Sequence, residues 1–164
     1  MDKLKQVLQD QKAQKDQPKE GTEIDIVQLV CFMVGDEEFG VPILSIQEII
    51  KPIESTRVPS TPSYVLGVFN LRGSVIPLID LSQKFKRTKK KMDENTRFIV
   101  IKNKNQVSGF VIDKLTEAIR INKDKIDPAP ESMNDDENHI YGVGKRDDRI
   151  ISILRIDALF KRNF

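Results

Sequence analysis

Short apolar runs recur along this chain from Val27 to Ile156, and polar turn residues separate them. Each run has the length of a β-strand and is too short for a helix of ordinary length. The Gly35–Glu38 and Asn103–Gln106 segments have the composition of hairpin tips. Regularly spaced short strands predict an all-β sandwich or barrel. The expected strands are Val27–Val34, Phe39–Ile43, Gly67–Asn70, Val75–Leu81, Phe98–Ile101, Val107–Ile112 and Ile150–Ile156.

A few segments depart from this rhythm. Ile43–Lys51 predicts a strand that bends or carries a helical turn. Asp80–Phe85 and Asp157–Arg162 are the segments most typical of short helices. Pro77 lies inside an expected strand but has no N–H to donate, so we expect that strand at the edge of a sheet or at a bulge.

The pattern occurs twice along the chain. Aligning Gly40 with Gly109 places Glu48 opposite Glu117. The chain therefore contains two related units of roughly seventy residues. The strand–turn–strand spacing of Gly67–Leu81 is repeated in the same way by Gly142–Ile156.

The repeat predicts the domain organisation. We expect one unit over residues 26–83, a basic linker over residues 84–95 and a second unit over residues 96–164, whose C-terminal segment is able to pack back on the first. Residues 1–25 are dominated by Gln, Lys and Asp, and they are typical of a disordered arm. The alternative interpretation of the arm is a partner-docking helix, because Leu4, Val7 and Leu8 would share one face of a helical turn.

Composition narrows the class of protein. The chain has 164 residues and a formal net charge of +2, which points to no particular polyanionic partner. Its one cysteine, Cys31, lies in an apolar run, which is more typical of a small buried hydrophobe than of a reactive nucleophile. There is neither a long apolar span nor a signal peptide, so we expect a cytoplasmic protein without direct membrane contact.

No catalytic, cofactor or metal site is expected. The sequence contains no nucleophile elbow, no phosphate-binding loop and no His-Glu-x-x-His or Cys-x-x-Cys pair. The single histidine, His139, has no second His or Cys beside it and is a poor metal site alone. The adjacent acidic run Asp135–Glu137 is more typical of solvated loop charge than of a cation site.

A lysine-rich run, Lys84–Lys91, lies between the two units. One interpretation is an electrostatic landing site for an acidic partner or for nucleic acid, and the other is a solvated linker. Phe85 is the only aromatic residue nearby, whereas single-strand binders interleave several rings with their charges. A small-barrel nucleic-acid-binding protein is therefore the alternative function.

Glu48 and Arg72 are isolated charges among apolar neighbours. They are either solvated surface charges, worth roughly 0–1 kcal/mol as a pair, or partners at a partly buried position that orients a binding surface. The sequence leaves both interpretations open. Gly73, which follows Arg72, suits a turn position with positive φ.

An ordered set of segments carries further information. The segments are Gly35–Leu44, Gln47–Ile49, Thr61–Gly67, Asn70–Gly73, Val75–Leu81, Asp127–Pro130 and the Gly142 turn with its closing strand. Together they resemble the CheW family of chemotaxis coupling proteins. The resemblance extends over about Val27 to Phe160, which is nearly the whole expected folded region. It implies a fold of two packed, five-stranded, SH3-like β-barrels without enzymatic activity.

The resemblance also implies partners and a site. Members of the family bridge the cytoplasmic tips of transmembrane methyl-accepting chemoreceptors and the related regulatory domain of the histidine kinase CheA. Some relatives also carry a receiver domain, but this chain stops at Phe164 with none following, which disfavours that alternative. By resemblance, the residues expected to bind receptor or kinase are Ile46, Glu48, Gly67, Asn70, Arg72 and Gly73.

Overall fold

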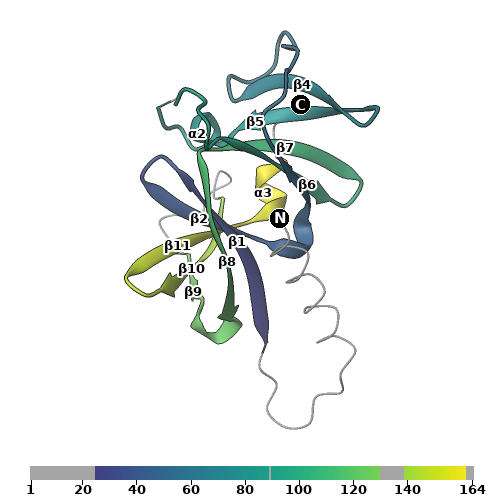
Figure 1. Ribbon diagram of the computed structural model, residues 1–164. Helices are drawn as coiled ribbons and strands as arrows, with labels where there is room; N and C mark the ends of the chain where they lie inside the picture. The colour runs from purple at the N-terminus through teal and green to yellow at the C-terminus, as the bar shows by residue number, and fades with distance from the viewer. Residues whose placement is uncertain (1–24, 89, 130–138, 162–164) are drawn as a thin grey trace.

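A computed structural model describes residues 25–88, 90–129 and 139–161. These residues form two packed β-sheets with short helical turns between strands (Figure 1). The predicted arm over residues 1–25 lies outside them except for Asp25, and so does the Asp135–Glu137 run. The all-β prediction is confirmed.

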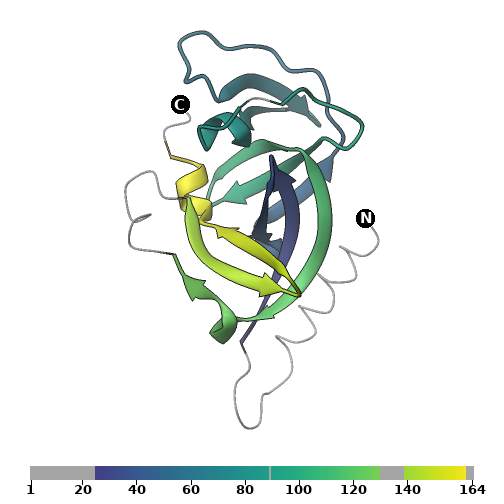
Figure 2. The same cartoon turned by 90° about the vertical axis from the view of Figure 1, so that its left-hand side faces the viewer.

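One sheet has six strands, and it curls around a common interior (Figure 2). Its strand order is β8-β1-β2-β11-β10-β9, one strand more than expected because the short β9 pairs with β10. The strands are β1 (Ile26–Val34), β2 (Glu37–Pro42), β8 (Lys114–Asn122), β9 (Asp127–Pro128), β10 (Ile140–Arg146) and β11 (Arg149–Leu154).

The other sheet has five strands in the order β3-β6-β7-β5-β4. Its strands are β3 (Ile46–Ile50), β4 (Val65–Leu71), β5 (Ser74–Asp80), β6 (Arg97–Asn103) and β7 (Gln106–Ile112). The turns η1 (Ile43–Ser45), α2 (Leu81–Lys84), η2 (Lys123–Lys125) and α3 (Ile156–Leu159) complete the described elements.

The strand order corrects the predicted division of the chain. The units over residues 26–83 and 96–164 do not form separate barrels, because each contributes strands to both sheets. The β1–β2 hairpin pairs with β8 and β11, and the β6–β7 hairpin pairs with β3 and β5. Local sequence patterns specify strands and hairpins, but they do not specify which distant strand completes a ladder. The pairing of β11 with β2 does place a C-terminal strand against the first unit.

The ladders nevertheless confirm the internal repeat. The β3–β6 ladder is irregular between Ile46 and Glu48. The β8–β1 ladder is irregular over the equivalent stretch between Leu115 and Ala118, which contains Glu117. In both sheets the hairpin continues into a parallel pair, β2 with β11 and β7 with β5. The two glutamates that the repeat aligned therefore both lie at the irregularity of their ladder, Glu117 within it and Glu48 directly after it.

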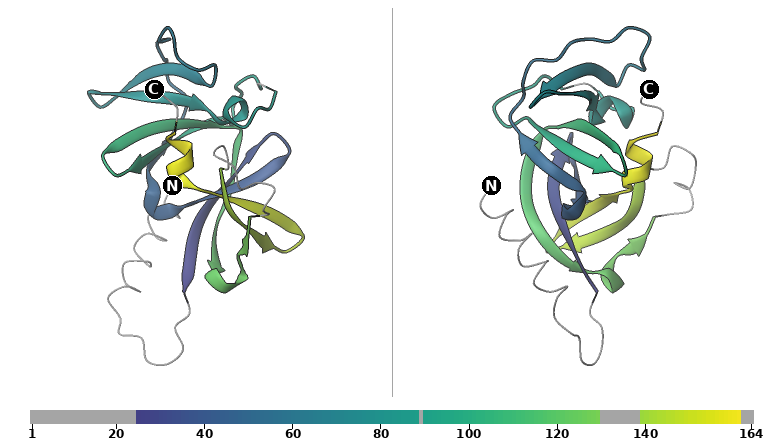
Figure 3. Two further views of the ribbon diagram at one scale, coloured as in Figure 1. Left: turned by 180° about the vertical axis from the view of Figure 1, so that it is seen from behind. Right: turned by 90° about the vertical axis from the view of Figure 1, so that its right-hand side faces the viewer.

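Alternating side chains fill three hydrophobic cores. In β1, Leu29 and Cys31 point into the interior of the six-stranded sheet, whereas Val30 and Phe32 belong to a core shared by both sheets. In β6, Ile99 belongs to the shared core, whereas Phe98 and Val100 belong to the third core, within the five-stranded sheet. Because both faces of these strands are buried, their sequences are continuous apolar runs rather than alternating ones. The helix α3 lies between the sheets in two views (Figure 1, Figure 3), where Leu159 is buried in the shared core.

The remaining local predictions were largely confirmed. Short helices form at both expected places, although Leu81 begins α2 instead of ending β5, because Asp80 caps the turn by accepting a hydrogen bond from the Ser82 amide at 3.1 Å. Of the two alternatives for Pro77, the edge strand was wrong, since β5 lies between β7 and β4. The bulge agrees with the irregularity of the β4–β5 ladder between Val65 and Gly67, beside the Pro77–Val68 pair. The strand tolerates Pro77 there because its pairing with β7 begins only at Leu78.

Candidate functional site

The Asn70–Gly73 segment forms the tight turn of the β4–β5 hairpin. Leu71 pairs with Ser74, so Arg72 and Gly73 are the two turn residues, with φ of 51° and 88°. Positive φ at both positions is the requirement of a type I′ turn. The Asn70 side-chain oxygen accepts a hydrogen bond from the Gly73 amide at 3.0 Å and holds the turn closed. The prediction of positive φ at Gly73 is confirmed.

This turn brings Arg72 to Glu48. The Arg72 guanidinium donates a hydrogen bond to Oε2 of Glu48, and the two side chains form an ion pair. The Arg72 side chain is 75% exposed and the Glu48 side chain 18%. Of the two interpretations left open by the sequence, the structure therefore agrees with the partly buried pair. Glu48 is its mostly buried member, and Arg72 reaches Glu48 from the surface.

The second carboxylate oxygen of Glu48 is buried without a hydrogen-bond partner among the described residues. Burying a carboxylate oxygen without a donor is costly, so native structures seldom retain one without a reason. The β3 irregularity that precedes Glu48 leaves Gln47 without a partner in the ladder and exposed. A bulge of this kind re-aims the extra side chain.

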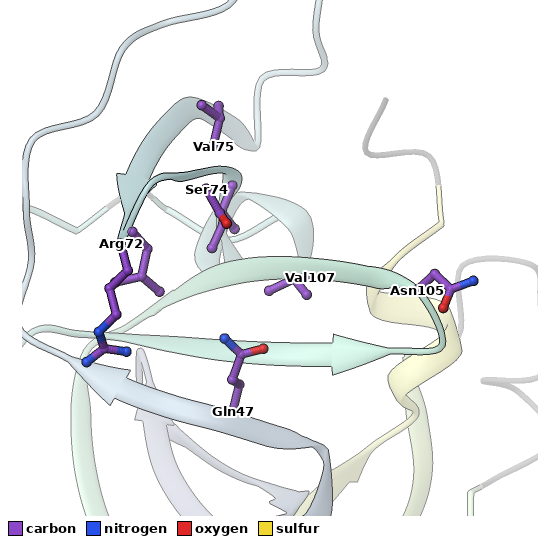
Figure 4. A pocket seen from close by; sticks show the side chains of 8 residues that line it. Gln47, Arg72, Ser74, Val75, Asn105 and Val107 are labelled. Carbon is purple, nitrogen blue, oxygen red and sulfur yellow. The ribbon is translucent and has the colours of Figure 1, made fainter.

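A groove with a volume of about 410 Å³ lies beside the pair (Figure 4). Figure 4 shows Arg72 at one end, Asn105 of the β6–β7 turn at the other, and Gln47 and Val107 between them. Val75 stands at the rim with 69% of its surface exposed. Strand β3 and the β4–β5 and β6–β7 hairpins thus converge on one surface that combines apolar walls with amide and guanidinium groups.

The other two predicted residues lie apart from the turn. Ile46 begins β3 and packs, half-buried, against the core shared by the two sheets, next to the exposed Leu44. Gly67 is buried in β4 with φ of 148°, and a Cβ placed on it would lie 2.1 Å from the Thr56 carbonyl oxygen. Glu48, Asn70, Arg72 and Gly73 therefore form one cluster, whereas Ile46 and Gly67 lie elsewhere.

Sequence reasoning missed the other groove residues. Gln47, Val75, Asn105 and Val107 were placed in strands or hairpin tips but were not proposed as site residues. The repeat offered one signal, because Val75 aligns with Ile150 and both are exposed large apolar residues that follow a hairpin turn.

In the six-stranded sheet, the charged residues around Glu117, the counterpart of Glu48, are paired with one another. Glu38 is only 7% exposed and accepts hydrogen bonds from the Thr116 hydroxyl at 2.6 Å and from Arg149 at 3.4 Å. Arg149 also pairs with Glu117, and this hydrogen bond is the main cause of the raised pKa of the Arg149 guanidinium. Glu117 therefore differs from its counterpart Glu48, one of whose oxygens has no donor.

Below this network lies Cys31. Burial, followed by the charges of Glu38 and Glu117, raises the pKa of the Cys31 thiol to about 12. The thiolate is therefore scarce at neutral pH, in agreement with the predicted role as a buried hydrophobe.

The described part of the lysine-rich run is not one continuous cationic surface. Lys84 is buried and donates a hydrogen bond to the Lys161 carbonyl oxygen at 2.9 Å, and its ammonium lies 4.4 Å from the centre of the Tyr64 ring. Arg87 forms an ion pair with Glu37 at 2.8 Å. Two of the cations thus stabilise the fold itself.

Among the described residues, no group of three or more His, Cys, Asp or Glu side chains is arranged to hold a metal ion. The helices found there are all too short or too polar to cross a membrane.

A protein-family model, that of the CheW-like domain, matches residues 28–164 of this sequence. The chain belongs to the CheW-like family. It is 48% identical to the chemotaxis protein CheW of Helicobacter pylori over 98% of both chains. It is 35% identical to the chemotaxis protein CheW of Klebsiella aerogenes over 80% of both chains.

Its fold is similar to that of a solved CheW-like structure. The crystal structure of the scaffolding protein TtCheW from Thermoanaerobacter tengcongensis matches with a TM-score of 0.78 and 32% identity, over 85% of this chain and 95% of that chain. None of these comparisons supports the nucleic-acid alternative. The chain is thus a chemotaxis scaffold of the CheW-like family.

Proposed function

We propose that this chain is a non-catalytic, cytoplasmic coupler that joins chemoreceptor tips to the regulatory domain of the histidine kinase CheA. Its membership of a family whose relatives are named chemotaxis and scaffolding proteins supports this role. The structural observation behind the proposal is the Glu48–Arg72 pair beside an open groove, with one carboxylate oxygen of Glu48 left without a donor.

The groove has the composition of a protein-binding surface. Arg72 presents more N–H donors than a single carboxylate can accept, and arginine is among the residues that contribute most at interfaces. Covering the exposed Val75 side chain with a partner would stabilise a complex by about 1.5–3 kcal/mol. A donor from the partner would also satisfy the unpartnered oxygen of Glu48.

The second contact of a coupler belongs at the junction between the two sheets. Ile46 lies at this junction, and the neighbouring Leu44 is 55% exposed. Receptor tips are helical hairpins, and an apolar groove is a common docking surface for a helix. A signal passes through the coupler only when two receptor states make different contacts with it.

The test measures receptor-controlled phosphotransfer by the kinase in a reconstituted mixture of receptor membranes, kinase and this protein. We expect Glu48→Ala and Arg72→Ala to reduce receptor control of the kinase at least about tenfold, a loss of about 1.4 kcal/mol in coupling. Arg87→Ala is the matched control, since it removes an exposed ion pair with Glu37 and neither residue lines the groove.

The exchange variant Glu48→Arg/Arg72→Glu separates a structural pair from a recognition surface. A purely structural pair would be restored when its charges are exchanged, so coupling would return. A surface that a partner recognises would carry reversed charges, so coupling should stay lost although the protein remains folded. Normal coupling by both single alanine variants would refute the assignment of this site.

A further inference from the structure

A second groove lies at the start of β1, between η2 and α3. It has a volume of about 370 Å³, and its walls are mainly apolar. Tyr141, in its wall, is 49% exposed, and Ile26, next to the lining residue Val27, is 38% exposed. The apolar lining residues include Val27, Ile126, Tyr141, Ile153 and Ile156.

The described chain begins at the edge of this groove. Asp25 accepts a hydrogen bond through its backbone oxygen from the Lys123 amide at 2.8 Å. Its carboxylate also pairs with the Lys123 ammonium at 3.8 Å. Lys123 itself lines the groove. Residues 1–24 are therefore tethered where the apolar walls are open.

The tethered segment contains a matching apolar set. Leu4, Val7 and Leu8 have the spacing that places side chains on one face of a helical turn. The residues between Leu8 and Asp25 span several tens of ångströms when extended, at up to about 3.3–3.6 Å per residue, so the segment can reach back. A ligand tethered to its own protein has an effective concentration on the order of millimolar.

We propose that Leu4, Val7 and Leu8 occupy the groove lined by Val27, Ile126, Tyr141 and Ile156 within the same molecule. The occupant is in cis because the attachment point at Asp25 adjoins the groove. The mixed charge of the rim, with Lys123 and Asp157, suits a segment in which lysines and aspartates flank the apolar residues.

The experiment uses the full chain with a nitroxide on the variant Asp2→Cys. The native Cys31 is buried, with a thiol pKa raised to about 12, so a thiol reagent at neutral pH labels the introduced cysteine. Paramagnetic relaxation is then measured on methyl groups. We expect rates at Ile126, Ile153 and Ile156 at least about fivefold above those at Val58, in the loop between β3 and β4. That loop lies at the opposite end of the molecule from the start of β1 (Figure 1).

Matched variants test the contact itself. Leu4→Ser/Leu8→Ser in the arm, or Tyr141→Ala in the groove wall, should abolish the enhancement, whereas Lys3→Ser/Lys5→Ser should retain it. A mixture of nitroxide-labelled protein and isotope-labelled protein without nitroxide should show no enhancement, because docking is intramolecular. Equal rates at both sets of methyl groups would overturn the proposal. So would enhancement in the mixed sample, which would assign the groove to a second copy.

Discussion

Replacing Gly67 with alanine should destabilise the protein by more than an ordinary substitution in a strand. An added Cβ would lie 2.1 Å from the Thr56 oxygen, 2.7 Å from its carbonyl carbon and 3.0 Å from the Arg57 Cα. All three contacts are with backbone, so no side-chain rotation relieves them. The loop between β3 and β4 must move away from β4.

The size of the destabilisation depends on the interactions that the loop movement breaks. Thr56 and Val68 exchange two backbone hydrogen bonds, at 2.7 and 2.8 Å, and each contributes roughly 0.5–1.5 kcal/mol. A non-glycine residue held at a φ of 148° adds about 1–3 kcal/mol of strain. The expected loss in the free energy of unfolding is about 2–6 kcal/mol, a large fraction of the roughly 5–15 kcal/mol of a typical domain.

Gly73→Ala is the matched control. Gly73 also has a positive φ, 88°, but a Cβ there would have no heavy atom within 4 Å. It should cost only about 1–2 kcal/mol, the conformational penalty alone. Urea unfolding measures both variants, and amide hydrogen exchange at Val68 measures whether the bridge to Thr56 survives. Equal costs for the two variants, with unchanged protection at Val68, would refute the close-approach argument.

Substitutions of Gly67 and of Arg72 should affect the proposed site by different routes. Gly67 is buried, so an effect of its substitution on partner binding would act through the position of the loop between β3 and β4 rather than through direct contact. Arg72 is mostly exposed, so its substitution should change binding while the fold is retained. Comparing unfolding free energy with partner affinity for the two variants distinguishes these roles.

Two further predictions concern the six-stranded sheet. Thr116→Val removes the hydroxyl that donates to the buried Glu38 and should cost about 1–3 kcal/mol in urea unfolding, whereas Thr116→Ser should cost less because it retains the donor. The raised pKa of the Cys31 thiol should make stability fall between about pH 9, where the unfolded thiol ionises, and about pH 12, where the folded one does. The loss should be at most about 1.4 kcal/mol per pH unit, and Cys31→Ala should remove it. An unfolding midpoint with the same pH dependence in both proteins would contradict this account.

Several features of the fold were predictable because they depend on neighbouring residues. Hairpin tips at Gly35–Glu38 and Asn103–Gln106, and the positive φ of Gly73, follow from local turn chemistry. The alignment of Glu48 with Glu117 follows from comparing the chain with itself. The family followed from an ordered set of short segments, and the match over residues 28–164 confirmed it.

The site was only partly predictable. Glu48 and Arg72 were recognised as unusual charges, but their pairing depends on a turn that brings β4–β5 against β3. Val75 was placed in a strand of continuous apolar residues, and nothing in that run distinguishes its exposed position from the buried Leu78. Lys84 was assigned to a run that is either an electrostatic landing site or a solvated linker, but the fold buries its stem and gives its ammonium a carbonyl acceptor.

The sequence by itself determined the strand class, the hairpins, the turn conformation and the twofold repeat, because each depends on side chains that are close along the chain. Only the tertiary structure decided that the repeats exchange strands, with the β1–β2 hairpin completing the sheet of β8–β11. A strand edge presents the same backbone N–H and C=O groups to any partner, so the choice depends on burial of side chains from both halves. That choice also determines which charge remains incompletely paired, at Glu48 and not at Glu117.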